Sequence, residues 1–95
     1  MEFEWDEAKR LINLEKHGID FRRATKIWQR GVIDPHEDRI NGFEIRHIAL
    51  GIIGDDARVI AVVYTKRDGK RRIISARRAR RNERQAYQSQ FGYGD

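Results

Sequence analysis

The sequence predicts an α+β fold in which two N-terminal helices, an antiparallel sheet of about four strands and a C-terminal helix follow one another along 95 residues. Apolar residues recur at helical spacing as far as residue 30, and then alternate at a spacing of two as far as residue 77. The helical spacing returns from residue 79. Because dividing so short a chain would leave pieces too small to bury a core, residues 1–95 are expected to form a single domain.

The first helix is expected from Trp5 to His17. Asp6 is a good N-cap, and Gly18 supplies the left-handed residue that ends a helix. The apolar positions of this helix are Ala8, Leu11, Ile12 and Leu14. On the adjoining face, polar residues at i, i+4 and i+7 or i+8 form a stripe that is a candidate site: Lys9, Asn13, Lys16 and His17.

A second helix is expected from Asp20, its cap, to Gly31, with Phe21, Ala24, Ile27 and Trp28 at helical spacing. Four strands are expected to follow at residues 31–38, 43–53, 58–66 and 70–77. Pro35 weakens the first strand and places it at an edge. Hairpin turns are expected at Gly54-Asp55-Asp56 and Asp68-Gly69, since Gly and Asp tolerate positive φ.

A last helix is expected from Ala79 to about Gln90, with Ala86 and Tyr87 turned inward and the arginines outward. The tail at residues 92–95 is expected to fray. In the third strand both sides begin apolar and end polar, so the functional end of the sheet is expected where Tyr64, Lys66 and Arg67 emerge beside Arg71 and Arg72. The alternative is that these residues only mark a solvated hairpin.

Charge points to a polyanionic partner. The net charge is +5, but residues 66–84 hold ten Lys and Arg against two acidic residues. Such a cluster suits phosphates, because neutralising them releases counterions.

There is no Cys, which indicates a reducing cytoplasm and argues against a metal site or metal cofactor. No membrane span is expected, and the N-terminus lacks the basic and apolar regions of a secretory signal.

If the polyanion is RNA, its cleavage without a metal needs a base for the 2′-OH, a proton donor for the 5′-oxygen and cations around the scissile phosphate. Of the three histidines, His17 is the best candidate, because it lies at a helix end within the polar stripe. A capping role without catalysis is the competing interpretation. Arg77 is the best candidate to contact the phosphate, and Tyr64 could stack a base or only fill the core. Arg80, Arg81 and Arg84 fit a solvated helix face that pairs with Glu83.

The residues as a set resemble the BrnT family of toxins. The resemblance covers nearly the whole chain and rests on segments in a characteristic order: Phe3 to Lys9, Asn13, Lys16 to Ile19, Phe21, Glu44 to Arg46, Arg72 to Ala79, Glu83 and Tyr87. It implies a RelE/ParE-like fold and a ribonuclease that acts as the toxin of a type II toxin–antitoxin module. Residues 31–42 match least well.

The resemblance also implies a partner, a ribbon-helix-helix antitoxin of the BrnA kind. The toxin–antitoxin complex would bind DNA only through this antitoxin. The recurrent polar positions of the family indicate where the active surface lies. We assign catalytic roles to His17, Arg67, Arg77, Arg78, Lys9, Glu44 and Arg46, and substrate contacts to Asn13, Lys16, Tyr64, Arg72 and Arg81. Two alternatives stay open: a nucleic-acid-binding module without catalysis, and a gyrase-directed toxin.

Overall fold

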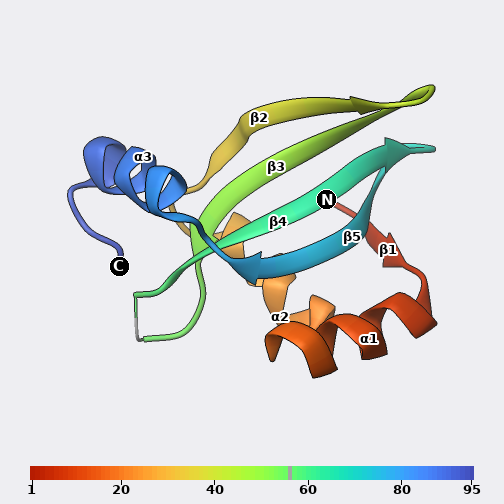
Figure 1. The fold of residues 1–95 in the computed structure, drawn as a ribbon, viewed down its shortest axis with the longest axis horizontal. Helices are drawn as coiled ribbons and strands as arrows, with labels where there is room; N and C mark the ends of the chain where they lie inside the picture. The colour runs from red at the N-terminus through yellow and green to blue at the C-terminus, as the bar shows by residue number, and fades with distance from the viewer. Residues whose placement is uncertain (56) are drawn as a thin grey trace.

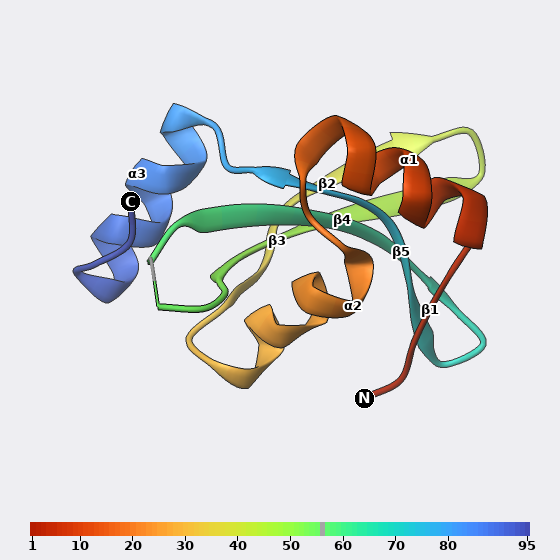
Figure 2. The ribbon, with the colours of Figure 1, turned by 90° about the horizontal axis from the view of Figure 1, so that it is seen from below.

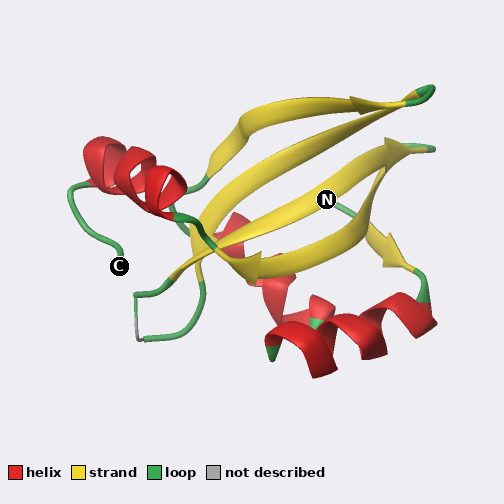
Figure 3. Cartoon of the chain, viewed as in Figure 1, coloured by secondary structure: helices red, strands yellow, loops and turns green. Residues whose placement is uncertain are grey.

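The computed structural model describes residues 1–55 and 57–95. Five strands form one sheet in the order β1-β5-β4-β3-β2, and every neighbouring pair is antiparallel except β1 and β5. Figure 1 shows the chain from β1 to α3, and Figure 3 marks its helices and strands. The elements are β1 (Phe3–Trp5), α1 (Glu7–His17), α2 (Phe21–Ala24), η1 (Thr25–Gln29), β2 (Ile33–Asn41), β3 (Glu44–Ile52), β4 (Val59–Arg67), β5 (Lys70–Arg78) and α3 (Arg81–Phe91).

The α+β class, the antiparallel meander and the C-terminal helix are confirmed, but the expected number of strands was wrong. The additional strand, β1, pairs in parallel with residues 71–73 of β5. Phe3 and Trp5 pack on the hydrophobic core, while Glu4 accepts a hydrogen bond from Arg72 at 2.7 Å. Three residues are too few to give a visible alternation, so this strand depends on contacts distant in sequence.

The second helix is shorter than expected and tightens into the 3₁₀ segment η1. Side chains three residues apart share one side of a 3₁₀ turn, so Ala24 and Ile27 both face the sheet. Ile27 comes so close to β3 that a Cβ on Gly51 would lie 2.6 Å from the Ile27 Cβ. Glycine at this position therefore allows η1 to pack directly on the strand.

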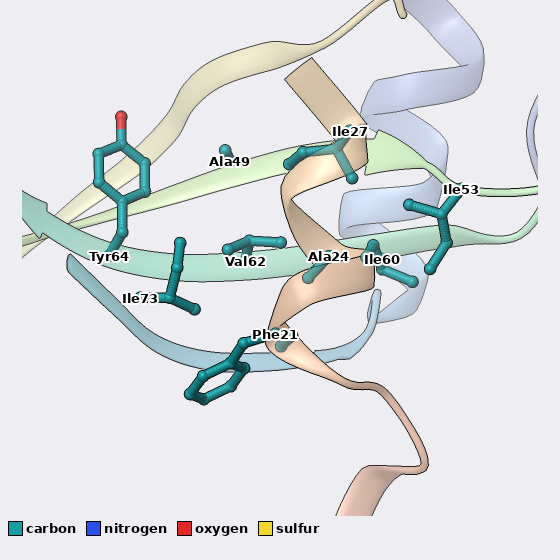
Figure 4. Close-up of a cluster of buried hydrophobic side chains, with 10 residues drawn as sticks. Phe21, Ala24, Ile27, Ala49, Ile53, Ile60, Val62, Tyr64 and Ile73 are labelled. Carbon is teal, nitrogen blue, oxygen red and sulfur yellow. The ribbon is translucent and has the colours of Figure 1, made fainter. Parts of the chain in front are cut away.

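The sheet is buried on both faces, but by different elements. α1, α2 and η1 lie against one face, as seen from below in Figure 2, while α3 covers one end of the other face. Figure 4 shows the core beneath the N-terminal helices. Its buried residues are Phe21, Ala24, Ile27, Ala49, Ile53, Ile60, Val62, Tyr64, Ile73 and Ala76. The core beneath α3 contains Ile48, Leu50, Ile52, Val59, Ala61, Ala79 and Tyr87.

The orientation of α1 is opposite to that of an ordinary amphipathic helix. Its apolar residues Ala8, Leu11 and Ile12 are exposed, with Leu11 at 53 % and Ile12 at 63 %, and its one buried residue is Asn13. The apolar side of α1 therefore faces solvent. The reason is that polar contacts dock this helix: Asn13 bonds to β5, and Arg10 bonds to Asp20 at 2.8 Å.

The remaining turns follow local rules, whereas the C-terminus is held by a contact distant in sequence. Asp68 and Gly69 both have positive φ, as the hairpin between β4 and β5 requires. In the expected turn at Gly54-Asp55-Asp56, Gly54 also has positive φ, while Asp56 lies outside the described residues. The tail folds back on the sheet, because Val59 N–H donates to the Asp95 carbonyl at 3.0 Å. Within the described residues, no helix is long and apolar enough to cross a membrane.

Candidate functional site

The outer edge of β5 is open from residue 74, because β1 pairs with β5 only as far as Ile73. A β-bulge lies at the same point. Ser75 pairs with Val63 and Ile73 pairs with Tyr64, which leaves Ile74 without a partner in β4. Bulges bend a strand and redirect the side chains beside them. Ile74 and Ser75 consequently line two grooves, one beside α1 and one on the opposite face of the sheet.

The groove beside α1, which we call the helix groove, contains the polar stripe expected from the sequence. Besides Ile74 and Ser75, it is lined by Lys9, Ile12, Asn13, Lys16 and His17. Asn13 differs from the others, because it is buried and donates to the carbonyls of Ile19 and Ala76, both at 2.9 Å. Its amide is therefore occupied in holding α1 to β5, and Lys9, Lys16 and His17 are the exposed groups of the groove.

The groove on the opposite face, which we call the arginine groove, has an apolar floor and a cationic rim. Ile48 and Val63 form the floor beside the bulge, and the rim consists of Arg39, Arg46, Arg77 and Arg80. Arg39 and Arg46 lie directly opposite each other on β2 and β3. Each pairs with an acidic residue of its own strand, Glu37 and Glu44 respectively. Exposed pairs of this kind are weak, so both arginines remain able to meet a phosphate.

Arg77 is held more firmly than the sequence suggests. Its guanidinium donates to both carboxylate oxygens of Glu83, at 2.7 and 3.1 Å, and Glu83 also accepts from the Arg80 N–H at 2.7 Å. Burial alone would raise the pKa of Glu83, but the bonds from Arg77 and Arg80 lower it below its usual value. The partner of Glu83 is thus Arg77 and not an exposed arginine of α3. This pair fixes the junction between β5 and α3.

His17 also borders a third cavity, at the C-terminal end of α1. Arg23, Arg58 and Arg78 line this cavity together with Ile53 and Ile60, and its volume is about 180 Å³. Arg78 follows Arg77 along β5, so its side chain points to the other face of the sheet. Within residues 1–55 and 57–95 the Arg78 side chain makes no ion pair. His17 and Arg78 are therefore an exposed imidazole and an exposed guanidinium in one cavity.

Two of the sequence-predicted residues lie at the far end of the sheet. Glu44 and Arg67 line an opening between the hairpin of β2 and β3 and the hairpin of β4 and β5. Arg72 is paired with Glu4 at 2.7 Å. Arg81 is exposed at the start of α3. Arg67 thus lies away from the grooves that meet at the β5 edge, whereas Glu44 lines this opening and pairs with Arg46 of the arginine groove.

Tyr64 belongs to a buried polar cluster that the sequence did not indicate. It is 1 % exposed and donates a hydrogen bond to Asp34, which also accepts from Trp28 Nε1 at 2.8 Å and from Arg71 at 3.3 Å. The Arg71 guanidinium lies over the Tyr64 and Trp28 rings. Burial and the bond to Asp34 raise the pKa of Tyr64 to about 12. In this conformation Tyr64 is too buried to stack on a base.

A comparison with protein-family models indicates which class of protein has this surface. Residues 5–83 match the model described as the ribonuclease toxin BrnT of type II toxin–antitoxin systems. The chain belongs to the BrnT family. A comparison with curated proteins finds no match. The matched region contains both grooves, including α1, the β5 edge and Glu83.

For a BrnT-family ribonuclease, the arrangement places cations on both sides of one strand edge. Lys9, Lys16 and His17 lie on the α1 side, and Arg46 lies with Arg77 on the other side. Within the described residues, no three His, Cys, Asp or Glu side chains come together as a possible metal site. The groups available for RNA at this edge are therefore one imidazole, several ammonium and guanidinium groups, and the Ser75 hydroxyl.

Proposed function

We propose that this chain is an endoribonuclease that cleaves RNA without a metal ion, as the toxin of its type II module. One observation carries the proposal: two cation-lined grooves meet at the open edge of β5, and His17 borders the meeting point. A single RNA strand laid around this edge would bring successive phosphates against both grooves. The cations would bind the phosphates and the imidazole would transfer a proton.

The reaction that suits these groups is an internal transfer. The 2′-oxygen of one nucleotide attacks the adjacent phosphorus and forms the O2′–P bond, while the P–O5′ bond breaks. A base takes the proton of the 2′-OH, and an acid gives a proton to the departing O5′. The products are a 2′,3′-cyclic phosphate and a 5′-hydroxyl, so atoms and charge balance without a water molecule or a cofactor.

We assign one of the two proton transfers to His17, because it is the histidine of the helix groove. Arg78 is the cation best placed to act with it, since both line one cavity and Arg78 makes no ion pair in the described part of the chain. A guanidinium can neutralise the additional negative charge of a pentacoordinate phosphorane. Arg77 has much of its charge neutralised by Glu83, so we assign it first to holding the β5 to α3 junction. Lys9, Lys16 and Arg46 would bind flanking phosphates.

The decisive experiment incubates the purified chain with a defined RNA in excess EDTA. Cleavage at an undiminished rate, with cyclic phosphate ends, is the expected result. Abolition by EDTA and recovery with Mg²⁺ would exclude the metal-free mechanism. Binding without cleavage under all conditions would favour a nucleic-acid-binding module, for which the same arginines would suffice. A loss of affinity of about tenfold or more between 50 and 200 mM salt is expected if about three phosphates are engaged.

We further infer that a BrnA-like ribbon-helix-helix antitoxin neutralises the toxin in the cytoplasm, and that only their complex binds DNA. The exposed apolar stripe of α1, formed by Ala8, Leu11 and Ile12, supports a docking surface there. Lys9 and Lys16 flank this stripe, so an apolar segment with acidic residues would complement it. A segment in this place would also cover the helix groove. The arrangement of the helices and the meander is consistent with a RelE/ParE-like fold.

A further inference from the structure

The sheet divides into two arms at the end opposite α3. The pairing between β3 and β4 begins at His47 and Tyr64, whereas β2 and β3 pair as far as Asn41 and Glu44, and β4 and β5 as far as Arg67 and Lys70. The two hairpins therefore extend beyond the last pair that joins them. Figure 1 shows them diverging at the right of the molecule. We call the opening between them the hairpin fork.

The two arms of the hairpin fork have different chemistry. Phe43, at the tip of the first hairpin, is fully exposed and lines the opening beside Ile45. Lys66 and Arg67 line it from the second hairpin, are exposed, and make no ion pair within the described residues. Glu44 adds a carboxylate that is paired with Arg46, and the Thr65 side chain is buried at the base of the opening. The opening thus combines an aromatic ring on one side with two cations on the other.

Nothing in the fold accounts for Phe43. A fully exposed phenylalanine in a hairpin turn buries no area, so it adds nothing to the stability of the chain. The turn itself depends on Gly42, whose φ is +67°. An aromatic side chain that is exposed at no structural benefit, next to exposed cations, is the usual composition of a site for single-stranded nucleic acid. The ring stacks on a base while the cations neutralise its phosphates.

We propose that the hairpin fork binds one nucleotide of single-stranded RNA outside the cleavage site, with its base stacked on Phe43 and its phosphate held by Lys66 and Arg67. This inference rests on the proposed ribonuclease function and adds a binding subsite to it. A protein partner is the less favoured occupant. Ile40 and Ile45 are also exposed and would suit an apolar protein interface. Two adjacent cations, however, suit the repeated negative charges of an RNA backbone better than they suit such an interface.

The test measures binding of a short single-stranded RNA that contains the fluorescent base 2-aminopurine. Every 2′-OH of this RNA is replaced by a 2′-O-methyl group, so that it cannot be cut. Phe43→Ala is expected to raise Kd by about 5- to 100-fold, which is the usual range for loss of one stacked base. Phe43→Leu is the matched control, because it keeps apolar bulk but cannot stack, and it is expected to bind as weakly as Phe43→Ala. Phe43→Trp is expected to restore affinity and the quenching of 2-aminopurine.

Salt dependence separates the two arms. The slope of log K against log salt should be the same in Phe43→Ala as in the wild type, since stacking releases no counterions. In the double variant Lys66→Ala, Arg67→Ala the slope should become shallower by about 0.7 for each phosphate that is no longer neutralised. Thermal melts of all variants establish that they are folded, as expected for exposed positions.

Unchanged affinity in Phe43→Ala, or wild-type affinity in Phe43→Leu, would overturn the proposal. Weaker binding of the antitoxin with unchanged RNA affinity would also overturn it and assign the hairpin fork to a protein. Failure of the proposed nuclease activity can be distinguished from failure of the proposed subsite. If the wild type binds the probe through Phe43 but does not cut ordinary RNA, the subsite stands and the ribonuclease mechanism does not. If the wild type and Phe43→Ala cut and bind equally, only the subsite is lost.

Discussion

The side-chain amide of Asn13 forms two hydrogen bonds with the backbone of Ala76. Its Nδ2 donates to the Ala76 carbonyl at 2.9 Å, and its Oδ1 accepts from the Ala76 N–H at 3.1 Å. The amide thus pairs with the open edge of β5 as a residue of an adjacent strand would. One side chain on α1 satisfies a backbone edge 63 residues further along the chain. The position of α1, and of His17 one turn later, depends on this pairing.

Asn13→Ala is expected to destabilise the fold. The substitution leaves the N–H and C=O of Ala76 and the carbonyl of Ile19 without their partner, and each buried group left unsatisfied costs about 1–3 kcal/mol. Urea denaturation followed by circular dichroism measures the change. Lys16→Ala is the control on the same helix, because Lys16 is exposed and its loss should change stability by less than about 0.5 kcal/mol. Equal midpoints for the two variants would contradict a docking role for Asn13.

His17→Ala is expected to slow single-turnover cleavage by about 10²–10⁴, the usual cost of losing a general acid or base. Arg78→Ala should slow it by about 10²–10³, by analogy with the loss of an oxyanion donor. Both side chains are exposed, so melting temperatures should change little. His36→Ala is the matched control, since His36 lines neither groove. Variants of His17 and Arg78 that melt lower but cut at the wild-type rate when folded would show that both residues are structural.

The Arg77 and Glu83 pair should be strongly coupled in stability. Arg77→Ala leaves a carboxylate that is 3 % exposed without its main partner, which typically costs about 3–5 kcal/mol. In a double-mutant cycle, Arg77→Ala with Glu83→Gln should lose less than the sum of the single variants. Arg77→Lys should recover only part of the loss, because lysine cannot form the bidentate contact. Additive losses would show that the pair contributes little beyond its separate members.

Acid should weaken the junction between α1 and α2. The hydrogen bond from the Arg22 side chain holds the pKa of Asp20 well below its ordinary value. Burial of Asp20 opposes this shift, whereas the Arg22 N–H and the charge of Arg10 add to it. A carboxylate with a lowered pKa in the folded state stabilises fully above its unfolded pKa, which is about 3.9, and this contribution is lost as the pH falls further. Asp20→Asn keeps a good N-cap but removes the charge. The variant should be less stable than the wild type at pH 7, and the difference should shrink below about pH 4. A difference that is constant with pH would contradict the assignment.

The α1 stripe should matter for the antitoxin and not for RNA. Leu11→Ser removes an exposed side chain, so the fold and the cleavage rate should be unchanged. If the antitoxin buries Leu11, the loss of about 1.5–3 kcal/mol of apolar transfer energy should raise Kd of the complex by about 10- to 100-fold. Ile40→Ser is the control, because Ile40 is exposed on the hairpin of β2 and β3. Calorimetric titration that gave the same Kd for Leu11→Ser and the wild type would remove α1 from the interface.

Local signals in the sequence were enough to predict most elements but not how α1 faces the sheet. Asp6 and Gly18 cap α1 as expected, with Asp6 Oδ1 accepting from the Lys9 N–H at 3.1 Å and Gly18 in the left-handed conformation. The helix begins at Glu7 and not at Trp5, which belongs to β1. Periodicity cannot reveal that polar contacts turn the apolar side of the helix outward, because the partners of Asn13 and Arg10 lie in other elements. The Asn41-Gly42 dipeptide is a strong hairpin signal that could have extended the expected first strand to its observed end, although the two turn residues are Gly42 and Phe43.

The candidate site was predictable in composition but not in geometry. The expected polar stripe of Lys9, Lys16 and His17 lines a groove, and its role as a site stays a prediction. The β-bulge that joins this groove to the arginine groove depends on the register between β4 and β5, which no local pattern determines. The bond from the Arg80 N–H to Glu83 was predictable, because an acid three residues into a helix commonly caps its start, but the pairing of Glu83 with Arg77 depends on where β5 lies.

The parallel pairing of β1 with β5 connects the first strand of the chain to the last. The N-terminal segment emerges from the ribosome first, yet it has no place to bind until residues 71–76 have also emerged. Folding must therefore close a loop of nearly the whole chain, which makes it slower than for a fold with local contacts. A nascent toxin consequently lacks a formed β5 edge for most of its synthesis.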